Sequence, residues 1–282
     1  MGSESVGRES VGSESMGSDH DPLAAYLAQH ATRALEGLRH LDAAPSVELV
    51  HDTRTSLRRL RATVRTFPQS FPDLVADDAD LQWVALGFGA VRDTDVLAEL
   101  LLPLAESLST ITAAAPSSEQ HALAAALTSA RERALTDLAV HAEEARWTRA
   151  VGQLERWSGA PPSLVTPATE DTLRRARDTV RGRLSAADGQ PTALHLARKA
   201  AKRWRYAAEL LAPVEPAAQQ HLEEAQQVQE VLGELQDTMI GTEFLDGLQD
   251  PGMSGIGALR GRLLDALNAS RSQLVARAES LL

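Results

Sequence analysis

The sequence repeats a distinctive basic pattern at an offset of 144 residues, as from His51 to His195. The first copy lies in HDTRTSLRRLRATVR (51–65) and the second in HLARKAAKRWRY (195–206). The offset pairs His51, Arg54, Arg58, Arg59 and Arg61 with His195, Arg198, Lys202, Arg203 and Arg205, and it also pairs Gly89 with Gly233 and Asp93 with Asp237. So many matches in one register indicate an internal duplication, which limits the chain to folds built from two similar halves.

Both halves have the composition of helical proteins. The chain is 43% hydrophobic but only 4% aromatic, and its apolar residues are mostly Ala and Leu, which favour helices. Breaks such as FPQSFPD, SGAPPS and DGQP separate segments of helical periodicity. We expect an all-α protein with helices over about 22–42, 46–67, 77–107, 118–158, 167–187, 191–213, 216–248 and 255–282.

The chain divides into a tail and two halves. Residues 1–20 repeat Gly, Ser and Glu with almost no apolar residue, a composition typical of disorder. SGAPPSLVTP (158–167) is the best boundary, which gives an N-terminal half over 21–158 and a C-terminal half over 167–282. With four helices in each half, the prediction is two four-helix bundles related by a pseudo-twofold axis.

One face of each repeated helix is cationic. At about 100° per residue, His51, Arg54, Arg58, Arg61 and Arg65 share an arc of roughly 80°. An adjoining arc is apolar and predicts burial in the bundle. Like charges at this spacing repel one another by a few tenths of a kcal/mol per pair, so the row weakens the helix. Its repetition in the same phase favours an anion-binding surface over a solvated face.

The length of the row suggests the kind of anion. From residue 51 to 65 a helix rises about 21 Å, which suits an extended polyanion better than a compact nucleotide. Arginine predominates, and its planar guanidinium binds phosphate oxygens in a bidentate manner. Because the whole chain has a net charge of −11, any anion must meet a local basic surface. The histidines that begin the rows could contact phosphate or bond a neighbouring helix, and the sequence leaves both open.

Four segments resemble the signatures of the conserved histidine α-helical domain, the CHAD family. VHDTRTSLRRLRATVRTF (50–67) and LHLARKAAKRWRYAAELL (194–211) are similar to its paired basic helices. LGFGAVRDTDVLAELL (86–101) and VLGELQDTMIGTEFL (231–245) are similar to the segments that follow them. The resemblance implies two four-helix bundles whose basic helices line a central groove or pore, binding of inorganic polyphosphate, and association with polyphosphate granules.

The resemblance also implies a set of polyphosphate-binding residues. The main contacts would be His51, Arg54, Arg58, Arg61, His195, Arg198, Lys202 and Arg205, flanked by Arg59, Arg65, Lys199 and Arg203, with Arg33, Arg177 and Arg181 extending the surface. Two positions depart from the repeat. At the offset of 144 residues, Arg65 corresponds to Glu209 and Arg92 corresponds to Gln236. We expect Arg92, Asp93 and Asp95 to serve structure, and Gly89 and Gly233 to permit close helix approach.

Other chemistries find less support in the sequence. The chain has no cysteine, and Walker A, His-Glu-x-x-His and Gly-x-Ser-x-Gly motifs are absent, as is the Glu-x-Glu-x-Lys signature of CYTH domains. We therefore expect a non-enzymatic polyphosphate-binding protein with no catalytic residue, cofactor or metal, no membrane or nucleic-acid partner, and a cytoplasmic location. A phosphohydrolase acting on polyphosphate or nucleotides and a general polyanion- or nucleic-acid-binding module remain the alternatives.

Overall fold

The computed structural model describes residues 22–41, 45–66, 78–108, 117–162, 170–187, 190–213, 215–248 and 256–281. Within these ranges the regular structure is helical, and no strand occurs. Nine α-helices follow one another as α1 (Pro22–Arg39), α2 (Val47–Thr66), α3 (Asp78–Ser107), α4 (Ser118–Ala142), α5 (Ala145–Gly159), α6 (Glu170–Ser185), α7 (Pro191–Leu211), α8 (Ala217–Gly247) and α9 (Gly257–Ser280). The all-α prediction is confirmed, while the predicted tail over 1–20 lies outside the described residues.

The chain turns sharply between α4 and α5, where the sequence predicted one helix over 118–158. That prediction is wrong, because Glu144 adopts an extended conformation and starts a new helix at Ala145. The turn lets α5 fold back and pack along α1. Trp147 and Trp157 bury against this contact, so tertiary packing overrides the local preference for a continuous helix.

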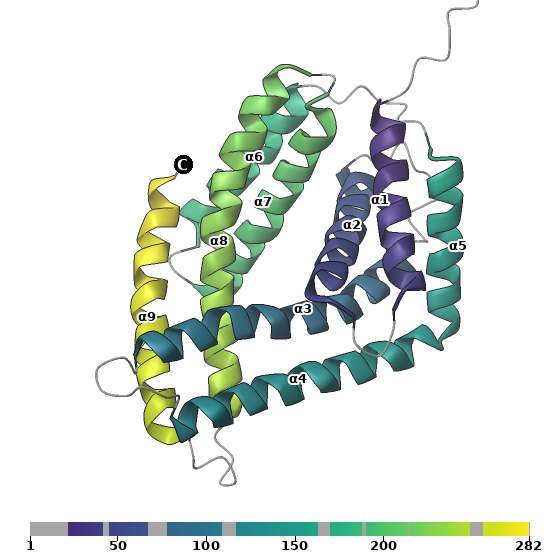
Figure 1. Cartoon of the computed structure of the whole chain (residues 1–282). Coiled ribbons are helices and arrows are strands. Elements are labelled where there is room, and N and C mark those ends of the chain that lie inside the picture. Colours follow the sequence, from purple (N-terminus) through teal and green to yellow (C-terminus); the bar gives the residue numbers. More distant parts are fainter. Residues whose placement is uncertain are drawn as a thin grey trace, which may run out of the picture.

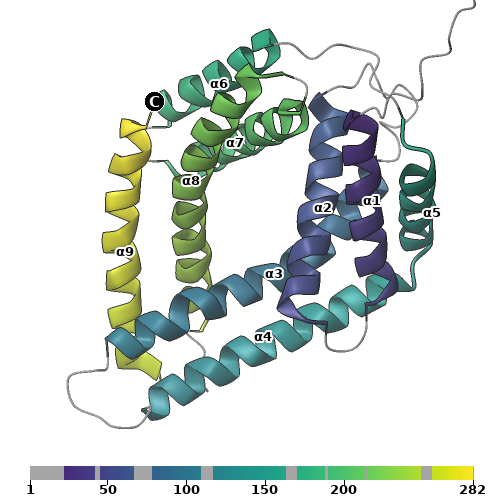
Figure 2. The ribbon, with the colours of Figure 1, turned by 45° about the horizontal axis from the view of Figure 1, so that its top comes forward.

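The helices form two groups joined by a long pair (Figures 1 and 2). Helices α1, α2 and α5 stand on one side, and α6 to α9 stand on the other. Helices α3 and α4 lie side by side and run from the first group to the lower ends of α8 and α9. Each basic helix is therefore packed between its neighbours in the same order, α2 between α1 and α3, and α7 between α6 and α8.

Three main apolar clusters hold this arrangement. The first joins α1, α2, α5 and the first half of α3, with Leu57 and Phe88 fully buried, and it also includes Leu210 from α7. The second joins α6, α7, α8 and the end of α9 around Trp204. The third joins the end of α3 and the start of α4 to the end of α8 and the start of α9, with Leu101 and Leu245 fully buried.

The third cluster takes residues from both halves of the sequence, and the described part of the first half contains five helices. Two separate four-helix bundles are therefore not confirmed. The apolar core instead continues from one half into the other, so each half depends on its partner for burial. The duplication and its pseudo-twofold axis stay predictions.

The glycines at helix contacts differ in part from those expected: at Gly89 of α3 a Cβ would lie 3.5 Å from Arg54 Nε of α2, which is ordinary contact. A Cβ on Gly37 of α1 would overlap the Thr53 side chain of α2, and one on Gly241 would lie 3.1 Å from both Leu100 and Leu267. At Gly233 nothing lies within 4 Å of such a Cβ, so the predicted close approach there is wrong.

None of the described helices combines the length and apolar character needed to cross a membrane.

Candidate functional site

The contact between α2 and α7 brings the two basic helices of the repeat together. On α2 the predicted apolar stripe is buried, and Val50, Leu57 and Leu60 are fully inaccessible. The cationic stripe is adjacent to the apolar stripe on the same helix, so it lies at the edge of the core. The helical phase read from the sequence thus places charged groups next to buried apolar ones.

Six side chains from four helices influence one another electrostatically, and we call them the central cluster. Its members are Arg54 and Arg58 on α2, Asp93 on α3, Arg198 and Lys202 on α7, and Asp237 on α8. Arg54 Nη2 lies 3.2 Å from Asp93 Oδ1 in an ion pair. The Arg58 guanidinium lies 5.5 Å from the centroid of the Tyr206 ring, within cation–π range.

The central cluster has an excess of cationic groups, with four basic side chains against two carboxylates. Burial is the main reason that the pKa of Arg54 and of Arg198 is lowered, although both remain charged near neutrality. The Nε atoms of Arg58 and Arg198, and that of nearby Arg205 on α7, are buried without a hydrogen-bond partner among the described residues. The excess of basic side chains at the contact between α2 and α7, rather than these buried donors, is what suits the cluster to receive an anion.

Two arginines predicted in the row, Arg61 and Arg65, are instead paired within the protein. Arg61 Nε lies 2.8 Å from Asp78 Oδ1, and Arg65 Nη2 lies 2.7 Å from Asp78 Oδ2. Asp78 is in the first turn of α3, where the helix dipole also stabilises a carboxylate. One carboxylate therefore pairs both arginines at the end of the row on α2 and offsets half of their charge.

Arg59 faces a different neighbour and joins the two halves. Its Nε lies 2.7 Å from Glu209 Oε1 on α7, in an ion pair with both side chains about one-fifth exposed. Tyr26 on α1 is beside this pair, and its pKa is raised by burial and by Glu209. The sequence departure at Glu209 thus has a structural reason, because Glu209 pairs with Arg59.

The two histidines that begin the rows differ in their surroundings. His51 is exposed, and its pKa is lowered by partial burial and then by Arg92. His195 Nδ1 lies 2.9 Å from Gln236 Oε1 on α8, which is the interhelical bond left open as an alternative. Gln236, the second departure from the repeat, therefore orients His195.

The remaining predicted residues lie apart from these contacts or on the surface. Arg33 on α1, Lys199 and Arg203 on α7, and Arg181 on α6 are exposed. Arg177 Nη1 lies 3.4 Å from Glu224 Oε2. A surface pocket of about 310 Å³ between α6, α8 and the chain end is lined by Arg177, Arg181, Glu224, Gln227, Val228 and Leu281.

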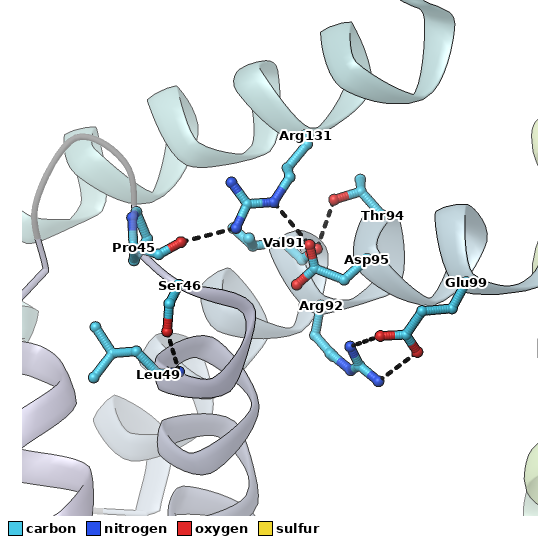
Figure 3. A network of polar contacts seen from close by, with 9 residues as sticks. All are labelled: Pro45, Ser46, Leu49, Val91, Arg92, Thr94, Asp95, Glu99 and Arg131. Atoms are coloured by element: carbon cyan, nitrogen blue, oxygen red, sulfur yellow. Dashed lines mark hydrogen bonds and ion pairs between the residues drawn. The ribbon is translucent and has the colours of Figure 1, made fainter. Parts of the chain in front are cut away.

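The segment after the first basic helix serves mainly to hold helices together (Figure 3). Arg92 forms a bidentate pair with Glu99 along α3, at 2.8 and 2.9 Å. Asp95, whose side chain is 2% exposed, accepts a 2.7 Å hydrogen bond from Arg131 of α4, and Arg131 also donates to the Pro45 carbonyl oxygen. Among the described residues, no group of three or more His, Asp or Glu could hold a metal ion.

Sequence reasoning missed two residues that shape the site, Asp78 and Tyr206. Asp78 could have been suspected as an acidic residue in the first turn of a helix that follows the basic row. Tyr206 lies one residue after the second row and is 1% exposed, although its ring contacts both Arg58 and Arg59. No local signal connects it to a helix nearly 150 residues earlier in the chain.

Comparisons with known proteins agree with this architecture. The chain is similar to a solved structure of PptA from Streptomyces chartreusis, at 22% identity and a TM-score of 0.67, covering 90% of this chain and 98% of that one. It is also similar to the crystal structure of the CHAD domain from the plant Ricinus communis, at 23% identity and a TM-score of 0.63, covering 96% and 98%. No curated protein matches. The CHAD domain family model matches residues 23–246, and the chain belongs to that family.

Proposed function

We propose that this protein binds inorganic polyphosphate at the central cluster, without hydrolysing it, and that this binding associates it with polyphosphate granules. The observation that carries the proposal is the excess of cationic groups between α2 and α7. Family membership supports it, because the family resemblance implies polyphosphate as the ligand. In this proposal the polyphosphate lies in a basic groove between two related halves of the chain.

In this proposal the arginines of the central cluster bind phosphate oxygens directly. Arg54 is held by its ion pair with Asp93 and Arg58 by its packing on Tyr206, so these two side chains lose little entropy on binding. The guanidinium groups of Arg58 and Arg198 would form charge-assisted hydrogen bonds with phosphate oxygens through atoms other than their buried Nε. Release of counterions from the polyanion would add a term that weakens as salt increases.

The paired arginines would take a smaller part. Arg61 and Arg65 share Asp78, and Arg59 shares Glu209, so a phosphate would have to compete with a carboxylate at each. The strongest contacts are therefore expected near Arg58 and Lys202, where the two basic helices meet. Exposed His51 would extend the surface at the start of α2.

The test is a competition titration at about 0.15 M salt, where surface charges are largely screened beyond about 8 Å. Labelled long-chain polyphosphate is displaced by short polyphosphate, ATP or single-stranded DNA, and free phosphate is followed with magnesium present. We expect tight binding that increases with chain length and no release of phosphate. Release of phosphate would instead support a phosphohydrolase, and equal displacement by DNA a general polyanion site.

A charge-reversed pair of variants locates the site. Replacing both Arg58 and Lys202 by Glu should weaken polyphosphate binding by at least about tenfold, since two cationic contacts become repulsive. The control replaces Arg133 of α4 and Arg175 of α6 by Glu, two exposed arginines whose loss changes the net charge equally. Equal weakening in both would mean that only net charge matters, and circular dichroism checks that each variant folds.

A further inference from the structure

A pocket on α5 carries charged groups that the proposed function does not use, and we call it the α5 pocket. Its lining includes Thr148, Arg149, Gly152, Gln153 and Arg156 of α5, together with Asp80 of α3. It measures about 320 Å³, near the lower end of the range of roughly 300–1,000 Å³ in which proteins bind small molecules. Its size therefore favours a compact ligand.

The α5 pocket is separate from the central cluster. Among the described helices, α5 packs only against α1, α3 and α4, and it stands at the outer edge of its group (Figure 1). On α3, Asp80 precedes Asp93 of the central cluster by 13 residues, which corresponds to about 20 Å along the helix. A ligand in the α5 pocket would therefore meet its own set of side chains.

The charges around the α5 pocket favour an anion. Two arginines share one carboxylate, since Arg149 Nε lies 2.6 Å from Asp80 Oδ2 and Arg146 Nε lies 2.9 Å from Asp80 Oδ1. Arg156 adds a third guanidinium group to the same part of α5. Three cationic groups thus stand against one carboxylate, and a negatively charged ligand would reduce the repulsion among them.

Both lining arginines are accessible to a ligand. The side chain of Arg149 is 59% exposed although it pairs with Asp80, and Arg156 is exposed as well. Arg156 Nη2 donates to Oε1 of Gln153, a residue that is only 2% exposed and so provides a fixed partner. The neighbouring Glu155 is paired with Arg39 of α1. Both guanidinium groups can therefore bind a ligand without leaving their present contacts.

Gly152 lies between these two arginines. Arg149, Gly152 and Arg156 follow one another at spacings of three and four residues, so they share one face of α5. Glycine inside a helix is unfavourable relative to alanine. Packing does not require it here, because a Cβ on Gly152 would have Arg156 Nη1 as its nearest neighbour, at an ordinary 3.8 Å. What Gly152 provides is open space between the two arginines.

We propose that the α5 pocket binds a phosphate group between Arg149 and Arg156, in the space that Gly152 leaves open. Two guanidinium groups suit a dianion, because each can form paired hydrogen bonds with phosphate oxygens. The hydroxyl group of Thr148 lines the same pocket and can donate a further hydrogen bond. The site does not depend on the proposed function, since it shares no residue with the central cluster.

Binding can be followed at Gly152 itself. In protein labelled with ¹⁵N at glycine, NMR shows the glycine amide signals, and Gly152→Ala identifies the Gly152 signal by its loss. Titration with inorganic phosphate at constant ionic strength should shift this signal in a saturable way, with a dissociation constant on the order of 1 mM for two charge-assisted contacts. Absence of a saturable shift would overturn the proposal.

A charge-removing variant tests the role of the arginines. Arg156→Gln removes one of the two lining cations, so phosphate affinity measured at Gly152 should decrease by about tenfold. The control, Arg133→Gln, removes an exposed arginine of α4, changes the net charge equally and should retain the native affinity. Equal weakening in both variants would mean that only net charge matters, and it would overturn the site.

Gly152→Leu separates a binding role from a structural one. Leucine favours helices, so the urea midpoint without phosphate should stay the same or increase. The larger side chain fills the space between the arginines, so the increase in midpoint that about 20 mM phosphate produces in the native protein should become smaller. A gain from phosphate equal to that of the native protein would contradict the proposal.

Two further comparisons identify the site and the ligand. When Arg58 and Lys202 are both replaced by Glu, the phosphate-dependent shift at Gly152 should persist, whereas its loss would overturn a site separate from the central cluster. Succinate, a dianion without a phosphate group, should bind about tenfold more weakly, and equal binding would overturn the assignment to phosphate. A phosphomonoester that binds more tightly than inorganic phosphate identifies an organic phosphate as the ligand, and equal affinity identifies the free ion.

Discussion

His30 should make the protein less stable in mildly acidic solution. The side chain is on α1, is only 3% exposed, and lies edge-on to the Tyr26 ring with a centroid distance of 4.4 Å. Burial, followed by Arg59 and Arg33, lowers the pKa of His30 from 6.5 to about 3. The folded protein thus keeps His30 neutral, whereas the unfolded chain gains a proton as pH falls below about 6.5.

The sign and the size follow from this difference. Because the unfolded state binds the extra proton, the free energy of unfolding decreases as pH falls from about 6.5 towards 3. The loss due to His30 is about 1.4 kcal/mol at pH 5.5 and about 2.7 kcal/mol at pH 4.5, relative to neutral pH. The loss becomes negligible at about pH 7.5, one unit above the ordinary pKa of histidine, where the unfolded chain is neutral at this position as well.

Urea unfolding followed by circular dichroism at pH 7.5, 5.5 and 4.5 tests the reasoning. His30→Phe keeps an aromatic ring beside Tyr26 but cannot titrate, so its stability should decrease less than that of the native protein by the amounts above. His40→Gln removes an exposed histidine that follows α1 and should retain the native pH dependence. If His30→Phe loses stability as steeply as the native protein, the buried neutral histidine is not the cause.

Three further changes test other contacts. Asp93→Asn removes a negative charge from the central cluster, so polyphosphate affinity should increase by roughly three- to tenfold in the competition titration. Weaker binding would instead show that Asp93 is needed to position Arg54. Arg131→Met leaves the buried Asp95 carboxylate unpaired, so the free energy of unfolding measured by urea unfolding should decrease by about 3–5 kcal/mol. Adding Asp95→Asn removes the unpaired charge and should recover part of this loss. Gly37→Ala should cost about 1–3 kcal/mol by the same measurement. A second change, Thr53→Ala, removes Oγ1 and Cγ2 but leaves Cβ 2.7 Å from the new methyl group, so it should restore only part of the loss if steric overlap is the reason.

The sequence predicts those parts of the molecule that depend on local periodicity. The helical phase of residues 51–65 separates an apolar stripe from a cationic one, and Leu57 and Leu60 are indeed fully buried. The all-α class follows equally from composition and spacing. Such features need no knowledge of where a distant helix lies, because neighbouring turns of one helix determine them.

Features that depend on distant helices could not be predicted in this way. Asp78 follows Arg65 by only 13 residues, but their pairing depends on how α3 returns along α2. Glu209 interrupts the second basic row in the sequence, yet its partner Arg59 belongs to the other half of the sequence. The turn before α5 contains neither Pro nor Gly, and packing of Trp147 and Trp157 determines it.

The third apolar cluster has a consequence for the order in which the protein can be made. Leu97, Leu101, Leu123 and Leu127 leave the ribosome more than a hundred residues before Leu245, Leu259 and Leu263, which cover them. At about 5–20 residues per second, the first half waits several seconds with this surface open to water. The third cluster can therefore be completed only after the first part of α9 has emerged, so the order of synthesis delays the step that joins the two halves.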